Sequence, residues 1–222
     1  MQLNMSTATT PAWTPDTQRP AGRQADNRII NEDILSNSPL LFEMLKSLSL
    51  TEQRCILDMG RASHSSIDFF GDFKCKLYIT DAISDLYKMD QKKNDTAPAW
   101  LKSLAKTLQF NQMDTTLDII FLWSLPNYLA PHHLKALINY LLPHTTSSTR
   151  MHAYIYNTQN MPAMPANYHI KRNNKVIISP VSSEQKNCPM YHLAELHSCF
   201  KPFKVDHAVM LSSGIQEYLF SA

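Results

Sequence analysis

Three residues early in the chain have the types and spacing of a nucleoside-binding site. Asp58 and Gly60 follow an apolar run in the stretch CILDMGRASHSS (55–66), and Asp81 closes the next apolar run, KCKLYITDA. Asp81 comes 21 residues after Gly60. A glycine turn after a strand, with an acid about 20 residues further on, is typical of folds in which the backbone approaches the ligand and the acid binds ribose hydroxyls. The pattern therefore indicates a cleft at the ends of two neighbouring strands.

Alternating strands and helices are expected to position these residues. An uninterrupted apolar run such as LDIIFLW predicts a strand that is covered on both faces. Spacings of three and four between apolar residues predict helices, and Ser38 before Pro39 is a candidate N-cap. Residues 87–98 are charged and loop-like. The predicted strands are Cys55–Met59, Cys75–Thr80, Leu117–Trp123, Met151–Tyr156, Val205–Leu211 and Gln216–Ser221. The predicted helices are one from Pro39 through Leu48, Ser65–Phe70, the stretch APAWLKSLAKTLQF (97–110), Pro131–Leu142 and Pro189–Phe200.

This order predicts an α/β fold with a mainly parallel sheet, helices on both faces and an antiparallel C-terminal strand. KRNNK, between Tyr168–Ile170 and Val176–Ser179, is expected to be the turn of a hairpin. Residues 1–27 are rich in Thr, Pro, Gln and Asn and are expected to form a disordered tail. Residues 28–222 are expected to form one domain. Trp13 in the tail is either incidental or a docking anchor for a partner.

Composition argues against three classes of protein: nucleic-acid binders, disulfide-stabilised secreted proteins and membrane-spanning proteins. A net charge of +2 gives no strong nucleic-acid signal, since such binders carry a clustered basic face. The four cysteines are scattered without a CxxC pair, which favours a reducing compartment. No apolar run reaches the about 18–20 residues that span a bilayer, and the N-terminus has no signal-peptide pattern. A cytoplasmic protein without a membrane segment is therefore expected.

Taken together, the motifs resemble the class I S-adenosylmethionine-dependent methyltransferases, which have a Rossmann-like fold. ILDMG resembles the first motif of that family and LYITDA the second. The later landmarks are LQFNQMDTTLDIIFLWSLPNYL, LINYLLPHTTSSTRMHAYIY and FKVDHAVMLSSGIQEYLFSA. The resemblance covers about residues 29–222. It implies S-adenosylmethionine as cofactor and a small molecule or a protein as methyl acceptor.

The resemblance also implies roles for individual residues. Asp58 would orient the loop and approach the methionine part of the cofactor, and Gly60 would be the first loop glycine. Asp81 would bind both ribose hydroxyls, and Phe110 lies in the region that frames the adenine. Asp114 and Asp118 fit the polar run into the fourth strand, without a fixed role.

The loop itself departs from the family's Gly-x-Gly-x-Gly pattern. Ala62 replaces the second glycine, and His64 places a bulky side chain where it would crowd the site. Ser63, Ser65 and Ser66 are small enough to cap the following helix. The sequence leaves open whether this loop binds the cofactor or is a relic.

Candidate catalytic residues lie after the fourth strand and in the later hairpin. Trp123 is a candidate cofactor contact, and Trp123 and Tyr128 could present aromatic faces to a sulfonium, while Ser124 and Asn127 could hold an acceptor. The alternative is that Trp123 belongs to the core and Asn127 to a turn. Tyr128 and His169 are the weak candidates for the catalytic residue.

No metal site is expected. Cys188, His192, Glu195 and Cys199 fall on one helical stripe, but a zinc site built from a single helix would be unusual. Two hypotheses follow from the sequence. The protein is either a methyltransferase with an unknown acceptor or a catalytically inactive relative that serves as a protein-interaction module.

Overall fold

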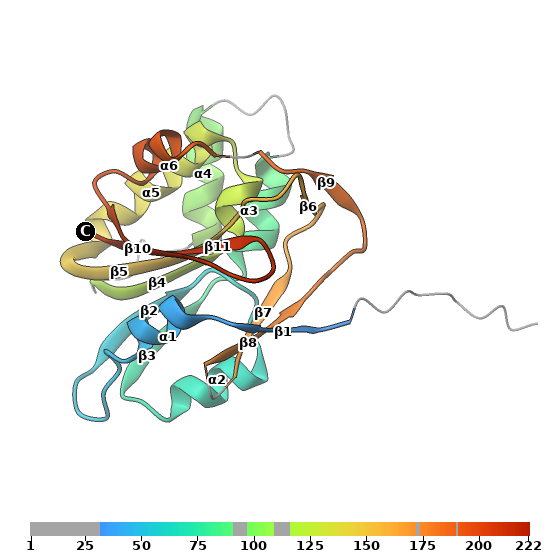
Figure 1. Ribbon diagram of the computed structural model, residues 1–222. Coiled ribbons are helices and arrows are strands. Elements are labelled where there is room, and N and C mark those ends of the chain that lie inside the picture. Colours follow the sequence, from blue (N-terminus) through green and yellow to red (C-terminus); the bar gives the residue numbers. More distant parts are fainter. Residues whose placement is uncertain (1–31, 91–96, 109–115, 172–173, 190) are drawn as a thin grey trace, which may run out of the picture.

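The computed structural model describes residues 32–90, 97–108, 116–171, 174–189 and 191–222, and its centre is a six-stranded sheet (Figure 1). The strand order is β10-β11-β5-β4-β2-β3. β3, β2, β4 and β5 are parallel, and β11 and β10 are antiparallel to their neighbours. The strands are β2 (Arg54–Asp58), β3 (Cys75–Ile79), β4 (Leu117–Trp123), β5 (Thr145–Tyr156), β10 (Lys204–Met210) and β11 (Ile215–Ser221). The predicted Rossmann-like α/β sheet, with its antiparallel C-terminal strand, is confirmed.

Helices cover both faces of this sheet, as predicted. Figure 1 shows α3 to α6 above the sheet, with α1 and α2 on the other side. The helices are α1 (Pro39–Leu45), α2 (His64–Gly71), α3 (Ala82–Asp90), α4 (Ala97–Leu108), α5 (Pro131–Leu141) and α6 (Leu193–Phe200), with the short 3-10 helices η2 (Leu125–Tyr128) and η3 (Leu142–His144). Because β4 is covered on both faces, every residue of it except Asp118 is buried.

Two smaller sheets complete the domain. β1 (Ile34–Asn37), β8 (Lys175–Ser179) and β7 (Asn167–Lys171) form an antiparallel sheet, in which β7 and β8 are the predicted hairpin. The backbone N–H of Ile170 donates to Ser66 Oγ at 3.0 Å, so β7 is attached to α2. β6 (Asn160–Pro162) pairs with β9 (Gln185–Asn187).

A buried polar network fixes the N-terminal segment on the main sheet. Glu217 of β11 is fully buried, and its carboxylate accepts hydrogen bonds from Ser38 Oγ and from the backbone N–H of Leu40 and Leu41. It also lies 2.9 Å from His152 Nε2. Ser38 is the N-cap residue of α1, as predicted, but its hydroxyl bonds to Glu217 and makes no capping hydrogen bond to the helix.

Two further predictions from the sequence need correction. Residues 87–98 were expected to be loop-like, but α3 extends to Asp90 and α4 begins at Ala97. The helix predicted to begin at Pro189 begins at Leu193. The predicted tail, residues 1–27, and Asp114 lie outside the described residues. None of the described helices is long and apolar enough to cross a membrane.

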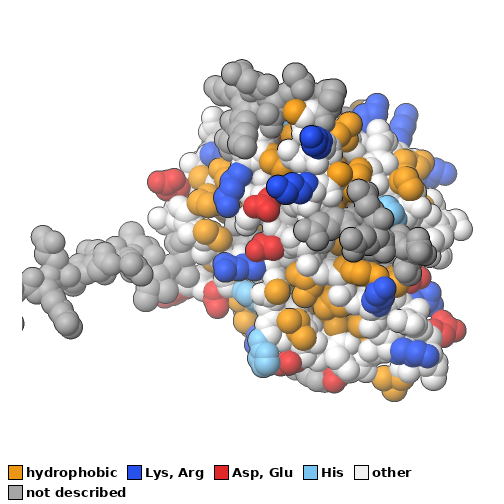
Figure 2. Space-filling model, turned by 180° about the vertical axis from the view of Figure 1, so that it is seen from behind, with side chains coloured by type: hydrophobic (Ala, Val, Ile, Leu, Met, Phe, Trp, Pro, Cys, Tyr) orange, Lys and Arg blue, Asp and Glu red, His pale blue; other side chains and the backbone are white. Residues whose placement is uncertain are grey.

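Surface charge on the described residues is mixed. On the face shown in Figure 2, Lys and Arg side chains lie among Asp, Glu and hydrophobic ones and do not merge into one basic surface. On this face the described residues therefore form no continuous basic surface of the kind that contacts a phosphate backbone.

Candidate functional site

The topology of the sheet places the candidate site between β2 and β4. β3, the next strand of the main sheet along the chain, pairs with β2 on one edge of β2, and β4 pairs with β2 on its other edge. The strand order of the sheet therefore reverses between β2 and β4. In open α/β sheets, ligands bind beyond the carboxyl ends of the strands at this switch point. Asp58 ends β2 and Trp123 ends β4, so these two predicted residues meet where a ligand would be expected.

Trp123 occupies the space beside Asp58 and Gly60. Its indole Nε1–H donates to Asp58 Oδ1 at 2.7 Å, and the backbone N–H of Gly60 donates to the same oxygen at 2.8 Å. Trp123 is fully buried. Its ring stacks on Tyr168 of β7, with centroids 4.8 Å apart and an interplanar angle of 4°. The indole is therefore packed between the Gly60 turn and the β7–β8 hairpin, and it does not face an open cleft.

The backbone of Trp123 explains how its side chain reaches this position. Its φ is +51°, a left-handed value that non-glycine residues rarely adopt. The pairing of β4 with β5 shifts register between Phe121 and Trp123. Irregularities of this kind re-aim a side chain next to functional sites. Here the side chain turns towards Asp58.

Gly60 is required by the closeness of this packing. A Cβ built at Gly60 would lie 2.8 Å from Trp123 Nε1 and 3.0 Å from Asp58 Oδ1. The role of Gly60 that is visible in the structure is therefore to leave room for the indole.

Asp58 is an acid without a cationic partner among the described residues. It is 3% exposed, and burial raises its pKa to about 6, although the hydrogen bonds from Trp123 and Gly60 act in the opposite direction. Both N–H donors bond to Oδ1, so this oxygen of the carboxyl is occupied without a ligand.

The rest of the loop turns away from this site. His64 was expected to crowd it, but its side chain is 92% exposed and lies 3.2 Å from Asp68 on the surface. Ala62 is also exposed. Ser63 caps α2 by accepting a hydrogen bond from the backbone N–H of Ser66 at 3.2 Å, as predicted for this group of serines.

Asp81 is exposed at the end of β3, next to the same turn. Its backbone N–H donates to Gly60 O at 3.2 Å, and its φ is +47°. Its carboxylate forms no hydrogen bond with any described residue, so it is available to a ligand. Phe110, the candidate for framing the adenine, lies outside the described residues.

The two weak catalytic candidates have different surroundings. The hydroxyl of Tyr128 is within 3.0 Å of Pro162 O and 3.1 Å of Met164 O, and burial raises its pKa above the ordinary range. His169 follows Tyr168 on β7, and successive side chains of a strand point to opposite faces. Because Tyr168 faces Trp123, His169 faces away from it, into a cavity that it shares with Arg61 and Lys171.

The two candidates for holding an acceptor are buried in the turn after β4. The amide of Asn127 donates to Ser124 O and Tyr154 O, each at 2.8 Å, and accepts from the backbone N–H of Tyr156 at 2.8 Å. Ser124 is fully buried. Asn127 therefore fixes η2 against β5, which agrees with the turn interpretation of this residue.

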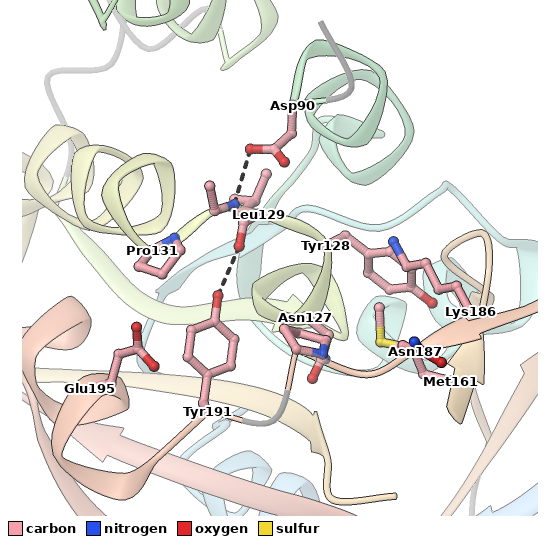
Figure 3. Close-up of a pocket in the computed structure, with 12 residues that line it drawn as sticks. Asp90, Asn127, Tyr128, Leu129, Pro131, Met161, Lys186, Asn187, Tyr191 and Glu195 are labelled. Atoms are coloured by element: carbon pink, nitrogen blue, oxygen red, sulfur yellow. Dashed lines mark hydrogen bonds between the residues drawn. The ribbon is translucent and has the colours of Figure 1, made fainter. Parts of the chain in front are cut away.

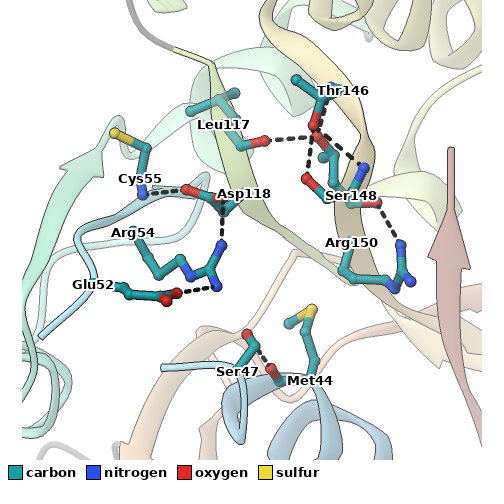
Figure 4. A network of polar contacts seen from close by, with 11 residues as sticks. Met44, Ser47, Glu52, Arg54, Cys55, Leu117, Asp118, Thr146, Ser148 and Arg150 are labelled. Carbon is teal, nitrogen blue, oxygen red and sulfur yellow. Dashed lines mark hydrogen bonds and ion pairs between the residues drawn. The ribbon is translucent and has the colours of Figure 1, made fainter. Parts of the chain in front are cut away.

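Asp118 lies at the opposite end of β4 from the site. Figure 4 shows its carboxylate accepting hydrogen bonds from the backbone N–H of Cys55 at 2.7 Å and from Arg54 Nη1 at 3.2 Å. It therefore fastens β4 to β2 and has no contact with the switch point.

The helical stripe of possible zinc ligands does not form in the structure. Cys188 lies outside α6, which begins at Leu193. Among the described residues, no group of three His, Cys, Asp or Glu side chains could hold a metal ion.

Comparison with known proteins gives distant structural likenesses. No protein-family model matches the chain, and no curated protein matches it. The PH0226 protein from Pyrococcus horikoshii OT3 aligns with a TM-score of 0.45 and 13% identity over 82% of this chain and 86% of that one.

Two further solved structures are named methyltransferases. The 1,6-didemethyltoxoflavin-N1-methyltransferase of Burkholderia thailandensis, with bound S-adenosylhomocysteine, gives a TM-score of 0.44 and 9% identity over 82% of this chain and 75% of that one. The magnesium protoporphyrin IX methyltransferase of Synechocystis PCC 6803, with bound SAM, aligns with a TM-score of 0.43 and 8% identity. The alignment covers 82% of this chain and 76% of that one. These matches do not by themselves assign the chain to a family.

Proposed function

We propose that the protein is a methyltransferase-like module whose cofactor site is closed by its own Trp123, and that it acts by binding a protein partner and not by methyl transfer. The observation that carries this proposal is the indole of Trp123 at the switch point, bonded to Asp58 at 2.7 Å.

The chemistry of the cofactor explains why this contact matters. By the family resemblance, Asp58 would approach the methionine part of S-adenosylmethionine, whose ammonium group is an N–H donor. The indole N–H already supplies a donor to that carboxylate, and the ring fills the space over Gly60. Tyr168 covers the outer face of the ring. The methionine part of the cofactor and this position of Trp123 therefore exclude each other.

Isothermal titration of S-adenosylmethionine and S-adenosylhomocysteine tests the proposal. We expect no binding to the wild-type protein at millimolar ligand, and measurable binding to Trp123→Ser, in which the indole is absent. Asp81→Ala in the Trp123→Ser background serves as the matched control and should remove that binding. Micromolar binding to the wild type that is lost in Asp81→Ala alone would contradict the proposal.

A second candidate function is S-adenosylmethionine-dependent methyl transfer to a small molecule or a protein. Asp81 favours it, because this acid stands at the predicted ribose position with its carboxylate unbonded among the described residues. In this case Trp123 would have to leave Asp58 when the cofactor binds. The same titration separates the two candidates, since only the second predicts tight binding to the wild type.

A further inference from the structure

The cavity that His169 faces lies beside the loop that follows Gly60, and neither Asp58 nor Trp123 lines it. Its volume is about 460 Å³, within the range of small-molecule sites. Its walls come from the loop before α2, the start of α2, β7, β8 and the segment before β1.

One face of the β7–β8 hairpin supplies a wall of this cavity. Successive side chains of a strand point to opposite faces, so Tyr168 and Ile170 are buried on one face of β7, whereas His169 and Lys171 lie on the face that lines the cavity. Ile177, the cross-strand partner of His169, lines the cavity as well. The alternation of β7 therefore brings a histidine and a lysine to the same wall.

Positive charge exceeds negative charge in the lining of this cavity. Arg61 and Lys171 both line it, and neither forms a salt bridge or a side-chain hydrogen bond with any described residue. Among the described residues of the lining, Asp33 is the only acid, and its Oδ1 accepts a hydrogen bond from Ser179 Oγ at 2.5 Å. The two cations therefore lack bonded counter-ions, and an anionic ligand would supply one.

Two histidines add further polar groups. His64 lies 3.2 Å from Asp68 on the surface of α2, so its partner is an acid of its own helix. Burial lowers the pKa of His169, Asp33 opposes this shift and Lys171 adds to it. A neutral imidazole at position 169 still carries one N–H donor.

Hydrogen bonds hold the walls in place. The carbonyl of Gly60, just before Arg61, accepts from the backbone N–H of Asp81 at 3.2 Å. The bond from the backbone N–H of Ile170 to Ser66 Oγ fixes β7 against α2. The cavity is therefore largely formed before any ligand arrives, which limits the entropy lost on binding.

A second cavity provides a comparison. Figure 3 shows it beside η2, with a volume of about 420 Å³, and there Lys186 is accompanied by the acids Asp90 and Glu195. Burial lowers the pKa of Lys186, and the carboxylate of Asp90 opposes this shift. The acids of that cavity outnumber its lysine, whereas the cations Arg61 and Lys171 outnumber the single acid of the first cavity. An anion is therefore expected at the first cavity and not at the second.

We propose that the cavity beside Arg61 binds a phosphate monoester, with the phosphate oxygens at Arg61 and Lys171 and the imidazole of His169 as a further donor. The planar fork of an arginine matches two phosphate oxygens, and a lysine adds a compact charge. The inference does not rest on the proposed function, because Asp58 and Trp123 do not line this cavity.

Probes of matched shape test the charge that the cavity prefers. Phenyl phosphate and phenyl sulfate, which carries one negative charge fewer, are compared by isothermal titration at about pH 8, where a phosphate ester has close to two negative charges. We expect phenyl phosphate to bind at least about tenfold more tightly, since hydrogen bonds gain strength with the charge of the acceptor. Equal affinity of the two esters, or no binding of phenyl phosphate at millimolar concentration, would overturn the proposal.

A third probe identifies the source of the phosphate. A short neutral peptide with one phosphoserine is titrated in the same way. Binding tighter than that of phenyl phosphate would mean that the phosphate is carried by a protein chain, and weaker binding would mean that it belongs to a small molecule.

Variants assign the contacts. Arg61→Gln and Lys171→Met should each lower the affinity for phenyl phosphate at least about tenfold, whereas Arg61→Lys, which keeps the charge, should lose less. Asp33→Asn should raise the affinity, because it removes the acid that repels the phosphate, and a folding defect would not produce a gain. Lys102→Met, at an exposed position on α4, is the matched control and should change nothing. Unchanged affinity in Arg61→Gln and Lys171→Met, or an equal loss in Lys102→Met, would refute the assignment, and thermal unfolding of each variant checks that it is folded.

Discussion

The contact between Gly60 and Trp123 can be tested by changing each residue alone and both together. In Gly60→Ala, the new Cβ would lie 2.8 Å from Trp123 Nε1. The indole has little room to move, because it is fully buried, stacked on Tyr168 and bonded to Asp58. Gly60 does not have a positive φ, so the backbone accepts alanine and the penalty comes from the clash.

The expected magnitudes follow from this geometry. Gly60→Ala should lower the free energy of unfolding by about 1–3 kcal/mol, the usual cost of overpacking a rigid site. Trp123→Ala should cost about 3–5 kcal/mol through the cavity it leaves. In the Trp123→Ala background the alanine at position 60 has lost its obstacle, so its cost should fall below about 0.5 kcal/mol. The coupling energy between the two positions is then about 1–3 kcal/mol.

Urea denaturation of the four proteins, followed by far-UV circular dichroism, gives these values. Gly71→Ala is the matched control, because a Cβ there meets no atom within 4 Å. It should be neutral or slightly stabilising. If Gly60→Ala costs as much in the Trp123→Ala background as in the wild type, Trp123 does not fill the space at Gly60, and the argument for a closed cofactor site fails.

Three further outcomes are expected. Burial raises the pKa of Asp58 from 3.8 to about 6, so between these pH values the native state holds a proton on Asp58 that the unfolded state has lost. The contribution of Asp58 to the free energy of unfolding therefore falls as pH rises through this interval. Asp58→Asn should remove this pH dependence, as measured by urea denaturation at several pH values between 3.8 and 6. Glu217→Gln should cost about 1–3 kcal/mol at neutral pH, because the hydrogen bonds from His152, Ser38 and Leu41, which hold its pKa low against the effect of burial, lose their charged acceptor; an unchanged urea midpoint would contradict this role. Ser66→Ala should speed hydrogen exchange at the backbone N–H of Ile170, which loses its acceptor, while the amides of β4 remain protected.

The sequence was informative where periodicity and burial coincide. Leu117–Trp123 was predicted to residue accuracy, because a run of apolar side chains covered on both faces allows little else. The hairpin around KRNNK was predicted from its turn residues. By contrast, β1 gave no local signal, since it pairs with residues 175–178, far along the chain. Helix α3 (Ala82–Asp90) was not predicted, because charged residues run from it into the following segment and mask the helical spacing of its few apolar residues.

The two acidic residues of the candidate site could be predicted from the sequence, but the indole that fills the site could not. Asp58 and Asp81 stand at strand ends, as their spacing indicated. The closure by Trp123 depends on a left-handed backbone and a register shift against β5, neither of which the residue types encode. Whether the protein is cytoplasmic and whether residues 1–27 are disordered stay predictions.

The bond between Ser38 and Glu217 joins residues 179 positions apart and so constrains the order of events during synthesis. The segment 34–45 cannot gain its native contacts until β11 has left the ribosome. Until then Leu40, Leu41 and Met44 lack β10 and β11, part of the sheet on which α1 packs, and they are more available to chaperones or to other nascent chains. The docking of this early segment onto β11 is therefore expected to come late in folding.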